Sequence, residues 1–324
     1  MPLLSLVTEM TLSRDSRVYI AGHRGLVGSA IVRRLEADGY TNLIVRSRAD
    51  LDLTRQEQVD AFFAAERPEY VVLAAAKVGG ILANNTYRGD FIRENLQIAT
   101  NVIDAAWRNG THKLVNLSSS CTYPRESPQP MREEYVMTGP LEPTNEPYAM
   151  AKLAAMSMCR AYHDQYGVEF VSAIPTNLYG PGDNYDLQGS HFLPAIIRKC
   201  HEAKVAGAST VTVLGTGRPR REYLYSDDCA DALVRILESY PGPGPINVGT
   251  GEDATIAAMA RTVASVIGFE GDLVFDPTKP DGMPQKLQDI SRLRQLGWAP
   301  RVLLEDGVRM TYDAYVAGLA AAAL

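Results

Sequence analysis

The sequence contains few cysteines, and their spacing excludes two classes of small stabilised fold. The four cysteines lie far apart and form no Cys-x-x-Cys pair; they are Cys121, Cys159, Cys200 and Cys229. This spacing argues against a disulfide framework and against a zinc knuckle. We therefore expect no metal site, and we expect a reducing, cytoplasmic environment.

Basic runs and long apolar runs are also missing. The chain has 32 Lys and Arg residues against 38 Asp and Glu residues, and its basic residues are dispersed, so no nucleic-acid partner is expected. No apolar run approaches the roughly 20 residues of a membrane span. Residues 1–16 contain Glu9 and Asp15 and lack a basic start. We expect them to form a loose N-terminal extension of a protein without a membrane partner.

What the chain does have is enough apolar sequence for a large core. Hydrophobic residues make up 46% of the 324 positions, which suits one large α/β domain and a smaller second one. Over residues 17–181, short apolar runs alternate with helical patterns such as 30–37 and 91–108. This order is typical of a Rossmann-type doubly wound parallel sheet, whose strands are buried on both faces. The expected strands are 18–21, 43–45, 70–75, 114–117 and 170–174.

Beyond Pro181 the elements shorten and proline and glycine become frequent. We expect residues 182–324 to form mainly a smaller α/β substrate-binding domain, while a segment around 220–250 returns to complete the first domain. The helix that begins near Tyr148 is apolar nearly all the way round, so it should be buried on two sides. One side would meet its own sheet and the other a second subunit of a homodimer; a monomer with extra covering elements is the alternative.

A glycine-rich turn follows the first expected strand and opens the first helix. Backbone N–H groups and the helix dipole at such a turn can hold a pyrophosphate. Its order of strand, turn and helix carries more weight than the glycines alone. The residues expected to contact the cofactor here are Gly22, His23, Arg24, Gly25, Leu26, Val27 and Gly28.

The residues after the second expected strand favour NADP(H) over NAD. NAD-specific sites usually place a carboxylate roughly 20 residues past the glycines, whereas this chain has Arg46-Ser47-Arg48. Guanidinium groups suit a 2′-phosphate, and Arg24 could add another; the alternative is that these arginines are ordinary surface residues. Asp52 and Leu53 are expected at the adenosine end, where Asp52 would touch the adenine or a turn backbone.

Tyr148 and Lys152 are four residues apart on one face of an expected helix. An ammonium group at this spacing should stabilise the phenolate and lower a tyrosine pKa whose reference value is about 10. Ser119 follows the 114–117 strand, at the sheet edge where doubly wound folds bind ligands, so its hydroxyl could orient the same carbonyl group. These three residues predict a site that moves hydride to or from a carbonyl carbon.

Several longer strings resemble the extended short-chain dehydrogenase/reductase family, and within it the epimerase/reductases that act on GDP-4-keto-6-deoxy-D-mannose. The strings are GHRGLVG at 22–28, AAAKVGG at 74–80, SSSCTYP at 118–124, NEPYAMAK at 145–152 and PTNLYGP at 175–181. The similarity runs from about residue 17 to residue 298. It implies inversion of the two carbons, C3 and C5, that flank the C4 ketone, followed by NADPH-dependent reduction of that ketone to give GDP-L-fucose.

The resemblance also supplies an acid/base pair for the inversions. It implies that Cys121 is the base and His191 the acid, one on either side of the sugar ring, and both types exchange protons near neutral pH. From the residues alone, Cys121 reads equally well as a small buried hydrophobe. From the residues alone, a helix-start or surface histidine is the more usual interpretation of His191.

Further contacts are implied only by the resemblance. The implied cofactor contacts are Leu117, Ser118, Ser119, Ser120, Lys152, Pro175, Thr176, Asn177, Leu178 and His191. The implied substrate contacts are Lys199, Leu214, Arg221 and Asp281. Two positions depart from the family pattern. This chain has Lys199 where the family has an arginine, and Leu214 where the family has a tryptophan near the guanine. The loss of an aromatic face weakens base stacking.

Two other functions are compatible with the fold. The first is another nucleotide-sugar enzyme, such as a UDP-sugar 4-epimerase or a GDP-mannose 4,6-dehydratase; Cys121 and the Arg46/Arg48 pair argue against the epimerase, and the lack of a carboxylate near Ser119 argues against the dehydratase. The second is a non-catalytic NADP(H)-sensing protein, because fold does not dictate activity. Stoichiometric consumption of NADPH with a 4-keto sugar would separate them.

Overall fold

The computed structural model describes residues 12–187, 189–279 and 281–322. Most of the expected N-terminal extension, residues 1–11, therefore lies outside the described residues. Residues 13–16 form a turn closed by a hydrogen bond from Ser16 N to Ser13 O of 3.1 Å. Leu12 packs against the first hydrophobic core, so the extension is anchored at least from that residue onward.

The central element is a six-stranded parallel sheet with the order β10-β5-β4-β3-β1-β2. Its strands are β1 (Val18–Ala21), β2 (Leu43–Ile44), β3 (Tyr70–Leu73), β4 (Lys113–Leu117), β5 (Glu169–Pro175) and β10 (Ile246–Val248). All five expected strands are confirmed, with shifts of one or two residues at some ends. The strand β10 is the late segment that completes the sheet.

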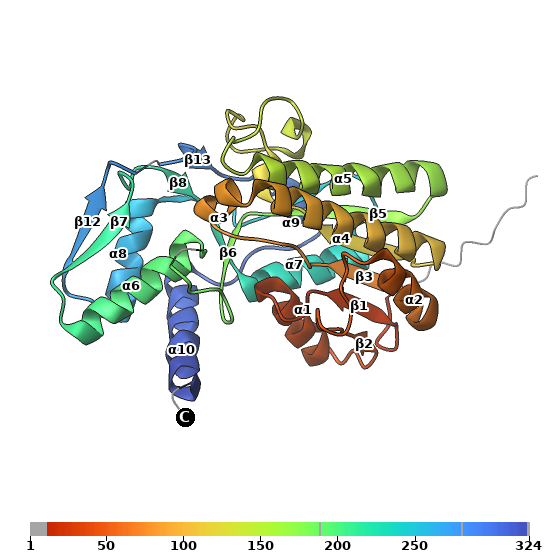
Figure 1. The fold of residues 1–324 in the computed structure, drawn as a ribbon, viewed down its shortest axis with the longest axis horizontal. Helices are drawn as coiled ribbons and strands as arrows, with labels where there is room; N and C mark the ends of the chain where they lie inside the picture. The colour runs from red at the N-terminus through yellow and green to blue at the C-terminus, as the bar shows by residue number, and fades with distance from the viewer. Residues whose placement is uncertain (1–11, 188, 280, 323–324) are drawn as a thin grey trace, which may run out of the picture.

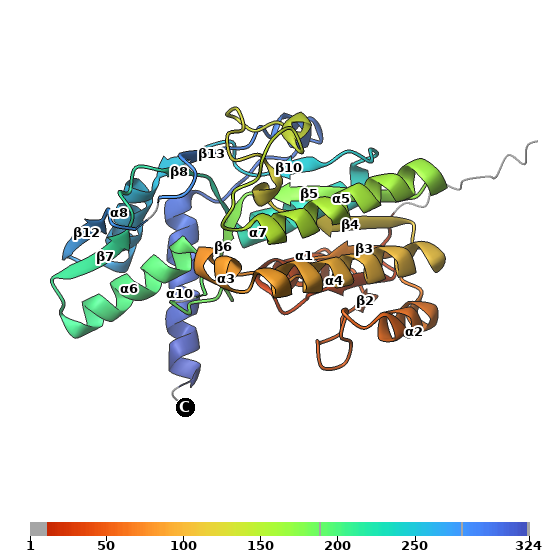
Figure 2. The same ribbon diagram turned by 45° about the horizontal axis from the view of Figure 1, so that its top comes forward.

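Helices cover both faces of this sheet (Figures 1 and 2). One face carries α1 (Leu26–Ala37) and α7 (Ser226–Ser239), and the other carries α2 (Gln56–Glu66), α4 (Arg88–Arg108) and α5 (Glu146–Tyr166). The helix α1 starts four residues earlier than the apolar pattern suggested, because its first turn is the glycine turn itself. It ends before Gly39, whose φ of 84° confirms the expected left-handed residue.

A second group of elements lies at one end of the sheet (Figure 1). Its own hydrophobic core is built from the helices α6 (Phe192–Ala206), α8 (Ile256–Ile267) and α10 (Leu304–Ala322), which pack around the parallel pair β7 (Thr210–Leu214) and β12 (Asp272–Asp276). This pair alternates buried and exposed residues along β7, as expected for a sheet with one covered face.

Short strands join the two groups. The strand β6 (Asn177–Tyr179) pairs with β9 (Tyr223–Tyr225), and a three-stranded sheet has the order β11 (Ala254–Thr255), β8 (Arg220–Arg221), β13 (Gln285–Lys286). The remaining short elements are α3 (Ile81–Thr86), α9 (Ser291–Gln295) and the 3-10 helices η1 (Ser120–Thr122) and η2 (Glu133–Tyr135). These segments place side chains from distant parts of the sequence beside the carboxyl ends of β4 and β5.

Candidate active site

The glycine turn packs too tightly against backbone to accept a side chain at Gly22 or Gly28. Gly22 has a φ of 86°, and a Cβ there would lie 2.7 Å from Ala75 N; a Cβ on Gly28 would lie 2.1 Å from Gly22 O. The first turn of α1 holds no acidic residue, so its free N–H groups and positive dipole end are open to an anion. His23 Nδ1 is buried without a hydrogen-bond partner in the described structure. The turn therefore has the form of a phosphate cradle.

The two arginines after β2, Arg46 and Arg48, differ in their partners and in their exposure. The Arg46 guanidinium is 2.5 Å from Glu66 Oε1 and packs over the Phe62 ring, so it is already engaged. The Arg48 side chain is 76% exposed, with its guanidinium 3.6 Å from Glu94 Oε2. Arg48 is therefore the more exposed and more loosely paired of the two arginines, and the one better placed to reach an anionic ligand.

Asp52 makes the turn contact that was one of its two expected roles. Its Oδ1 atom accepts hydrogen bonds from Thr54 N at 3.0 Å and from Thr54 Oγ1 at 2.8 Å, and these bonds lower the pKa of the carboxyl group. It thus holds a turn backbone, next to the buried Leu53.

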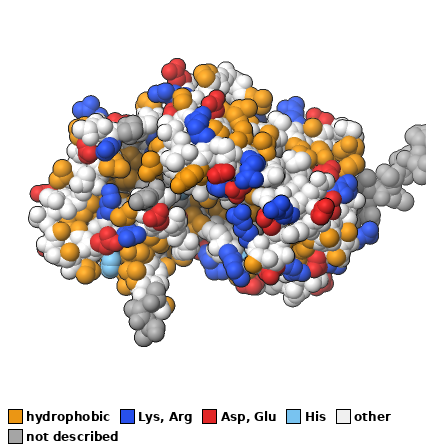
Figure 3. Space-filling model, in the orientation of Figure 1, with side chains coloured by type: hydrophobic (Ala, Val, Ile, Leu, Met, Phe, Trp, Pro, Cys, Tyr) orange, Lys and Arg blue, Asp and Glu red, His pale blue; other side chains and the backbone are white. Residues whose placement is uncertain are grey.

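Glu94 on α4 was not identified from the sequence. It receives a 2.6 Å hydrogen bond from Lys77 Nζ, and Arg48 and Arg93 also lie within ion-pair distance of its carboxylate. Lys and Arg side chains gather near the middle of the face shown in Figure 3. The Glu94 carboxylate holds these three cations close together, and their combined charge remains positive, which favours an anionic ligand.

Ser119, Tyr148 and Lys152 meet beyond the carboxyl end of β4. The Ser119 Oγ atom accepts a hydrogen bond from Cys121 N at 3.2 Å, and Ser119 is also a hydrogen-bond partner of Tyr148. The Lys152 Nζ atom donates to Leu117 O at 2.7 Å and lies 5.9 Å from the centre of the Tyr148 ring. The structure thus brings together the three residues expected to act on a carbonyl group.

The expected lowering of the Tyr148 pKa by Lys152 is wrong in this geometry. Burial raises the pKa of Tyr148, the nearby Cys121 raises it further, and only the Ser119 hydrogen bond opposes them. Burial also lowers the pKa of Lys152 to about 8. Sequence spacing reflects the effect of the lysine charge on the tyrosine pKa but not the effect of desolvation, which is the larger of the two here. The phenol is protonated at neutral pH, as a proton donor must be.

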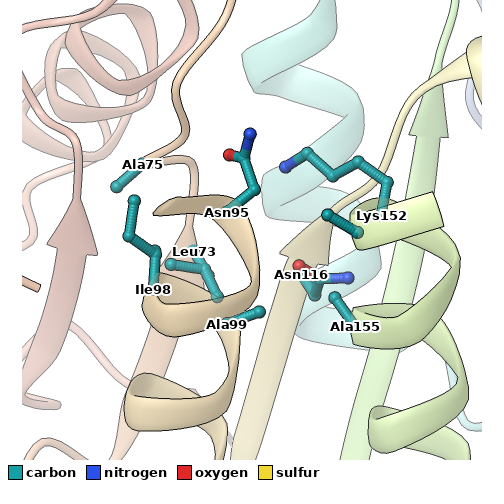
Figure 4. Close-up of a pocket in the computed structure, with 9 residues that line it drawn as sticks. Leu73, Ala75, Asn95, Ile98, Ala99, Asn116, Lys152 and Ala155 are labelled. Carbon is teal, nitrogen blue, oxygen red and sulfur yellow. The ribbon is translucent and has the colours of Figure 1, made fainter. Parts of the chain in front are cut away.

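A small cavity lies behind Lys152, between α4, α5 and the sheet (Figure 4). Its volume is about 10 Å³, enough for about one water molecule. Its polar wall consists of Asn95 from α4, Asn116 from β4 and Lys152. Asn95 binds backbone groups of Lys77 and Phe91, and Asn116 donates to Ser172 Oγ at 3.0 Å. These bonds fix the polar surroundings of the lysine.

Cys121 and His191 share one neighbour, Lys286. Cys121 is half-buried in η1, and its sulfur is 3.1 Å from Asn145 Nδ2 and 3.8 Å from Lys286 Nζ. His191 directly precedes α6. It is accessible to solvent, yet protein surrounds it closely, so desolvation lowers its pKa, and the charge of Lys286 lowers the same pKa further.

Two neighbours of Cys121 were missed from the sequence. Asn145 opens the string NEPYAMAK and could have been recognised from its place beside Tyr148. Lys286 lies in the two-residue strand β13, far along the chain, and no sequence pattern marks it.

The residues expected near the nicotinamide are held rigidly by backbone bonds. Thr176 N donates to Val248 O at 3.0 Å, and the side chains of Thr176 and Asn177 both donate to Glu222 O. Pro175 ends β5, and Leu178 pairs with Leu224. On the neighbouring strand, Ser118 N donates to Ala173 O, while the Ser118 hydroxyl is buried without a partner among the described residues, and Ser120 is buried.

Three of the four expected substrate residues converge around the loop after β7. The Asp281 carboxylate binds Thr216 N and Thr216 Oγ1, both at 2.7 Å. The Arg221 pKa is lowered chiefly by burial, with Asp281 and Cys121 among its electrostatic neighbours. Leu214, 57% exposed, offers an aliphatic surface.

The other two cations at this end have different partners. Lys199 donates to Thr212 O at 3.1 Å, two residues before Leu214. Arg220, the neighbour of Arg221, pairs with Asp253 at 2.6 Å instead.

Residues 12–187, 189–279 and 281–322 hold no group of three or more His, Cys, Asp or Glu residues able to bind a metal ion. Within the same ranges, no helix is long and apolar enough to span a membrane. All four cysteines are free thiols.

Comparison with known proteins identifies the family. Residues 18–249 match the NAD dependent epimerase/dehydratase family. GDP-L-fucose synthase 1 of Arabidopsis thaliana is 55% identical over 312 residues, 96% of each chain. The GDP-L-fucose synthase of Escherichia coli (strain K12) is 50% identical over 306 residues, 92% of this chain and 95% of that protein. A GDP-L-fucose synthetase structure from Naegleria fowleri bound to NADP has a TM-score of 0.89 at 28% identity, covering 96% of this chain and 97% of that chain. The resemblance found in the sequence is thereby confirmed, and the chain belongs to the NAD dependent epimerase/dehydratase family, in the branch that contains the GDP-L-fucose synthases.

Proposed function

We propose that this protein is an NADPH-dependent enzyme that converts GDP-4-keto-6-deoxy-D-mannose to GDP-L-fucose by epimerisation at C3 and C5 and reduction at C4. The observation that carries the proposal is the place of Cys121. Its thiol lies two residues after Ser119, which hydrogen-bonds Tyr148, and its sulfur contacts the same Lys286 that acts on His191. Cys121 and His191, which can exchange protons with carbon, and Ser119 and Tyr148, which can bind the carbonyl oxygen, can thus act on one ketone. The names of the relatives at 50–55% identity support the same reaction.

The residues present fit NADP(H). The Gly22–Gly28 turn packs closely on its own backbone at the start of α1, where N–H groups can bind a phosphate. The buried His23 Nδ1 and Ser118 Oγ atoms have no hydrogen-bond partner among the described residues, and Arg48 is exposed enough to reach a 2′-phosphate. The cofactor, when bound, supplies the hydride for C4. The other residues that would hold the cofactor are Asp52, Leu53, Leu117, Ser119, Ser120, Lys152, His191 and residues 175–178.

The epimerisations would use Cys121 and His191 on opposite faces of the sugar. The ketone acidifies the hydrogens on C3 and C5, so the Cys121 thiolate can remove one of these protons while the C–H electron pair forms an enolate. The Ser119 and Tyr148 hydroxyls donate hydrogen bonds to the enolate oxygen. His191 then returns a proton to the carbon from the other face. Proton exchange with solvent returns Cys121 and His191 to their starting protonation states before the second carbon reacts.

The reduction would use the protonated phenol of Tyr148. As the carbonyl carbon is reduced, the carbonyl oxygen takes the phenolic proton and becomes the C4 hydroxyl group. Burial keeps that proton on the phenol at neutral pH, because it raises the pKa of Tyr148. Lys152 holds the neighbouring strand end through Leu117 O.

The nucleotide end would lie near the loop after β7. Arg221 and Lys199 supply positive charge for the diphosphate, and Asp281 fixes the loop beside Arg221. Leu214 would contact the guanine through an aliphatic surface. We therefore expect weaker discrimination between bases than an aromatic side chain would give.

Incubation with GDP-4-keto-6-deoxy-D-mannose and NADPH in deuterated water tests the proposal. We expect one NADPH consumed per sugar, deuterium at C3 and C5, and GDP-L-fucose as product. Tyr148→Phe should lose reduction, whereas Cys121→Ser should yield sugar reduced without inversion. A cofactor that ends each cycle unchanged would favour another nucleotide-sugar enzyme of this fold. Binding of NADPH without turnover of any nucleotide 4-keto sugar would favour a sensing role.

We further propose that the protein is a homodimer formed through α4 and α5. Met150, Ala154, Ser157 and Ala161 form an exposed stripe on α5. A concavity of about 310 Å³ opens where α4 and α5 begin, lined by Arg88, Gly89, Ile92, Glu146, Pro147 and Met150. Sedimentation equilibrium of the wild type and of Ala154→Glu would test this interface, with a shift to monomer expected for the variant.

The division of labour and the location are also proposals. Residues 17–181 would bind the cofactor, completed by α7 and β10, while residues 182–324 would bind mainly the substrate. A cytoplasmic location suits four free cysteines of which one must stay reduced for catalysis.

A further inference from the structure

Lys286 is a buried cation with an unusual partner. It ends β13, in parallel register with Arg221 on β8, and only 9% of its surface is exposed. Its Nζ atom lies 3.8 Å from Cys121 Sγ. Within residues 12–187, 189–279 and 281–322, no carboxylate lies within ion-pair distance of this ammonium group, although many other lysines and arginines have such a partner.

A buried ammonium group without a counter-ion is unfavourable, because it has lost water and gained no opposite charge. The sulfur beside it can supply that charge, since a thiol becomes an anion when it loses its proton. A cation in contact with a cysteine favours the thiolate, which is the form that takes up protons. Asn145 Nδ2, at 3.1 Å from the same sulfur, is a second donor that favours the anion.

We propose that Lys286 is a positioning residue for the epimerisations, whose ammonium group holds the Cys121 sulfur as a thiolate facing the sugar. The inference rests on the proposed role of Cys121 as the base. It adds a residue that the reaction needs but that does not itself exchange protons with carbon.

Other charged groups around the sulfur do not replace Lys286. Arg221 on β8 and Tyr148 on α5 both interact electrostatically with Cys121. Glu142 interacts with Arg221 and so offsets part of its charge, and His191 interacts electrostatically with Lys286. Lys286 is the cation in contact with the sulfur, so its removal should have the largest effect.

The rate of alkylation by iodoacetamide, measured across pH, reports the thiolate directly. Cys159, Cys200 and Cys229 are buried, and burial raises the pKa of each thiol, so they should react slowly in the native protein; the Cys121→Ser variant gives the background. In Lys286→Met, the midpoint of the pH–rate profile should rise by about one pH unit, which slows alkylation at neutral pH about tenfold.

Two companion variants separate charge from structure. Lys286→Arg keeps the cation and should restore most of the wild-type profile. Lys279→Met removes an exposed lysine from the same region of the chain and should leave the profile unchanged. NADPH binding by each variant confirms that it is folded.

The histidine provides an independent readout. Because the charge of Lys286 contributes to the lowered pKa of His191, Lys286→Met should raise that pKa in an NMR titration of the imidazole protons. The resonance can be assigned with His191→Gln, since the chain has five histidines.

The inference is overturned if the alkylation profile of Lys286→Met coincides with that of the wild type. An unchanged profile together with a large rise in KM for the GDP-sugar would assign Lys286 to the diphosphate instead. Neither result affects the proposed function, which fails separately if Cys121→Ser still yields fully inverted product at the wild-type rate.

Discussion

Replacing Lys152 with methionine should stabilise the protein while abolishing reduction. The side chain is 6% exposed, and burial lowers its pKa from 10.5 to about 8. A difference of about 2.5 units corresponds to a cost of about 3 kcal/mol for holding the charged form at neutral pH. The variant removes this cost but leaves Leu117 O without its donor, which costs about 1 kcal/mol. We expect a net gain of about 2 kcal/mol at pH 7.

The pH dependence of this gain follows from linkage. Between pH 8 and 10.5 the folded lysine has lost its proton while the unfolded lysine still carries one, so wild-type stability due to this group rises with pH. The advantage of Lys152→Met should therefore shrink as pH rises through this window. Near pH 10.5 it should become a deficit of about 1 kcal/mol.

Urea unfolding without added ligand, followed by fluorescence at pH 7, 8, 9 and 10, measures the difference. Wild type and variant should show equal m-values, which would indicate that the same surface is exposed on unfolding. Lys152→Gln, which is neutral but polar, is the matched control and should retain part of the gain. A variant less stable than wild type at pH 7, or a difference that does not vary with pH, would refute the argument from buried charge.

Three further predictions concern other parts of the molecule. Arg48→Ser should raise KM for NADPH about tenfold with little change for NADH, whereas Arg46→Ser, whose native partner is Glu66, should have a smaller effect on this ratio in the same steady-state assay. Gly28→Ala should abolish NADPH binding in calorimetry, because its Cβ would lie 2.1 Å from the Gly22 carbonyl oxygen and no side chain can move aside; Gly39→Ala, where a Cβ meets nothing within 4 Å, is the control for stability alone. Burial raises the pKa of the Asp183 carboxyl group to about 7, so the contribution of this group to wild-type stability falls as pH rises from about 4 to 7. Asp183→Asn should therefore stabilise the protein by about 2–3 kcal/mol more at pH 8 than at pH 5. Equal gains at both pH values in thermal unfolding would contradict this reasoning.

The first sheet could be predicted because its signals are local. Runs such as residues 18–21 and 70–73 are apolar throughout, and a strand buried on both faces accommodates such runs without helical periodicity. The glycine turn, Tyr148 and Lys152 were found for the same reason, since each lies at a fixed distance from a recognisable element.

Tertiary partners could not be predicted in this way. The two arginines after β2 look alike in sequence, and only the position of Glu66 on α2 shows that Arg46 is engaged. Lys286 lies in a strand of two residues that pairs with another of the same length, too short for any periodicity. The direction of the Tyr148 pKa shift depends on how much water is excluded from the site, and sequence spacing carries no information about this.

The chain path has a practical consequence for anyone who wishes to isolate the nucleotide-binding half. The helix α7 and the strand β10 follow the excursion through α6 and β7, yet they cover α1 and pair with β5. A fragment ending at residue 181 would uncover the side of α1 that packs against α7 and expose the edge of β5, which invites aggregation. A working minimal fragment would have to be discontinuous, with residues 17–181 joined by a short linker to a segment that spans α7 and β10.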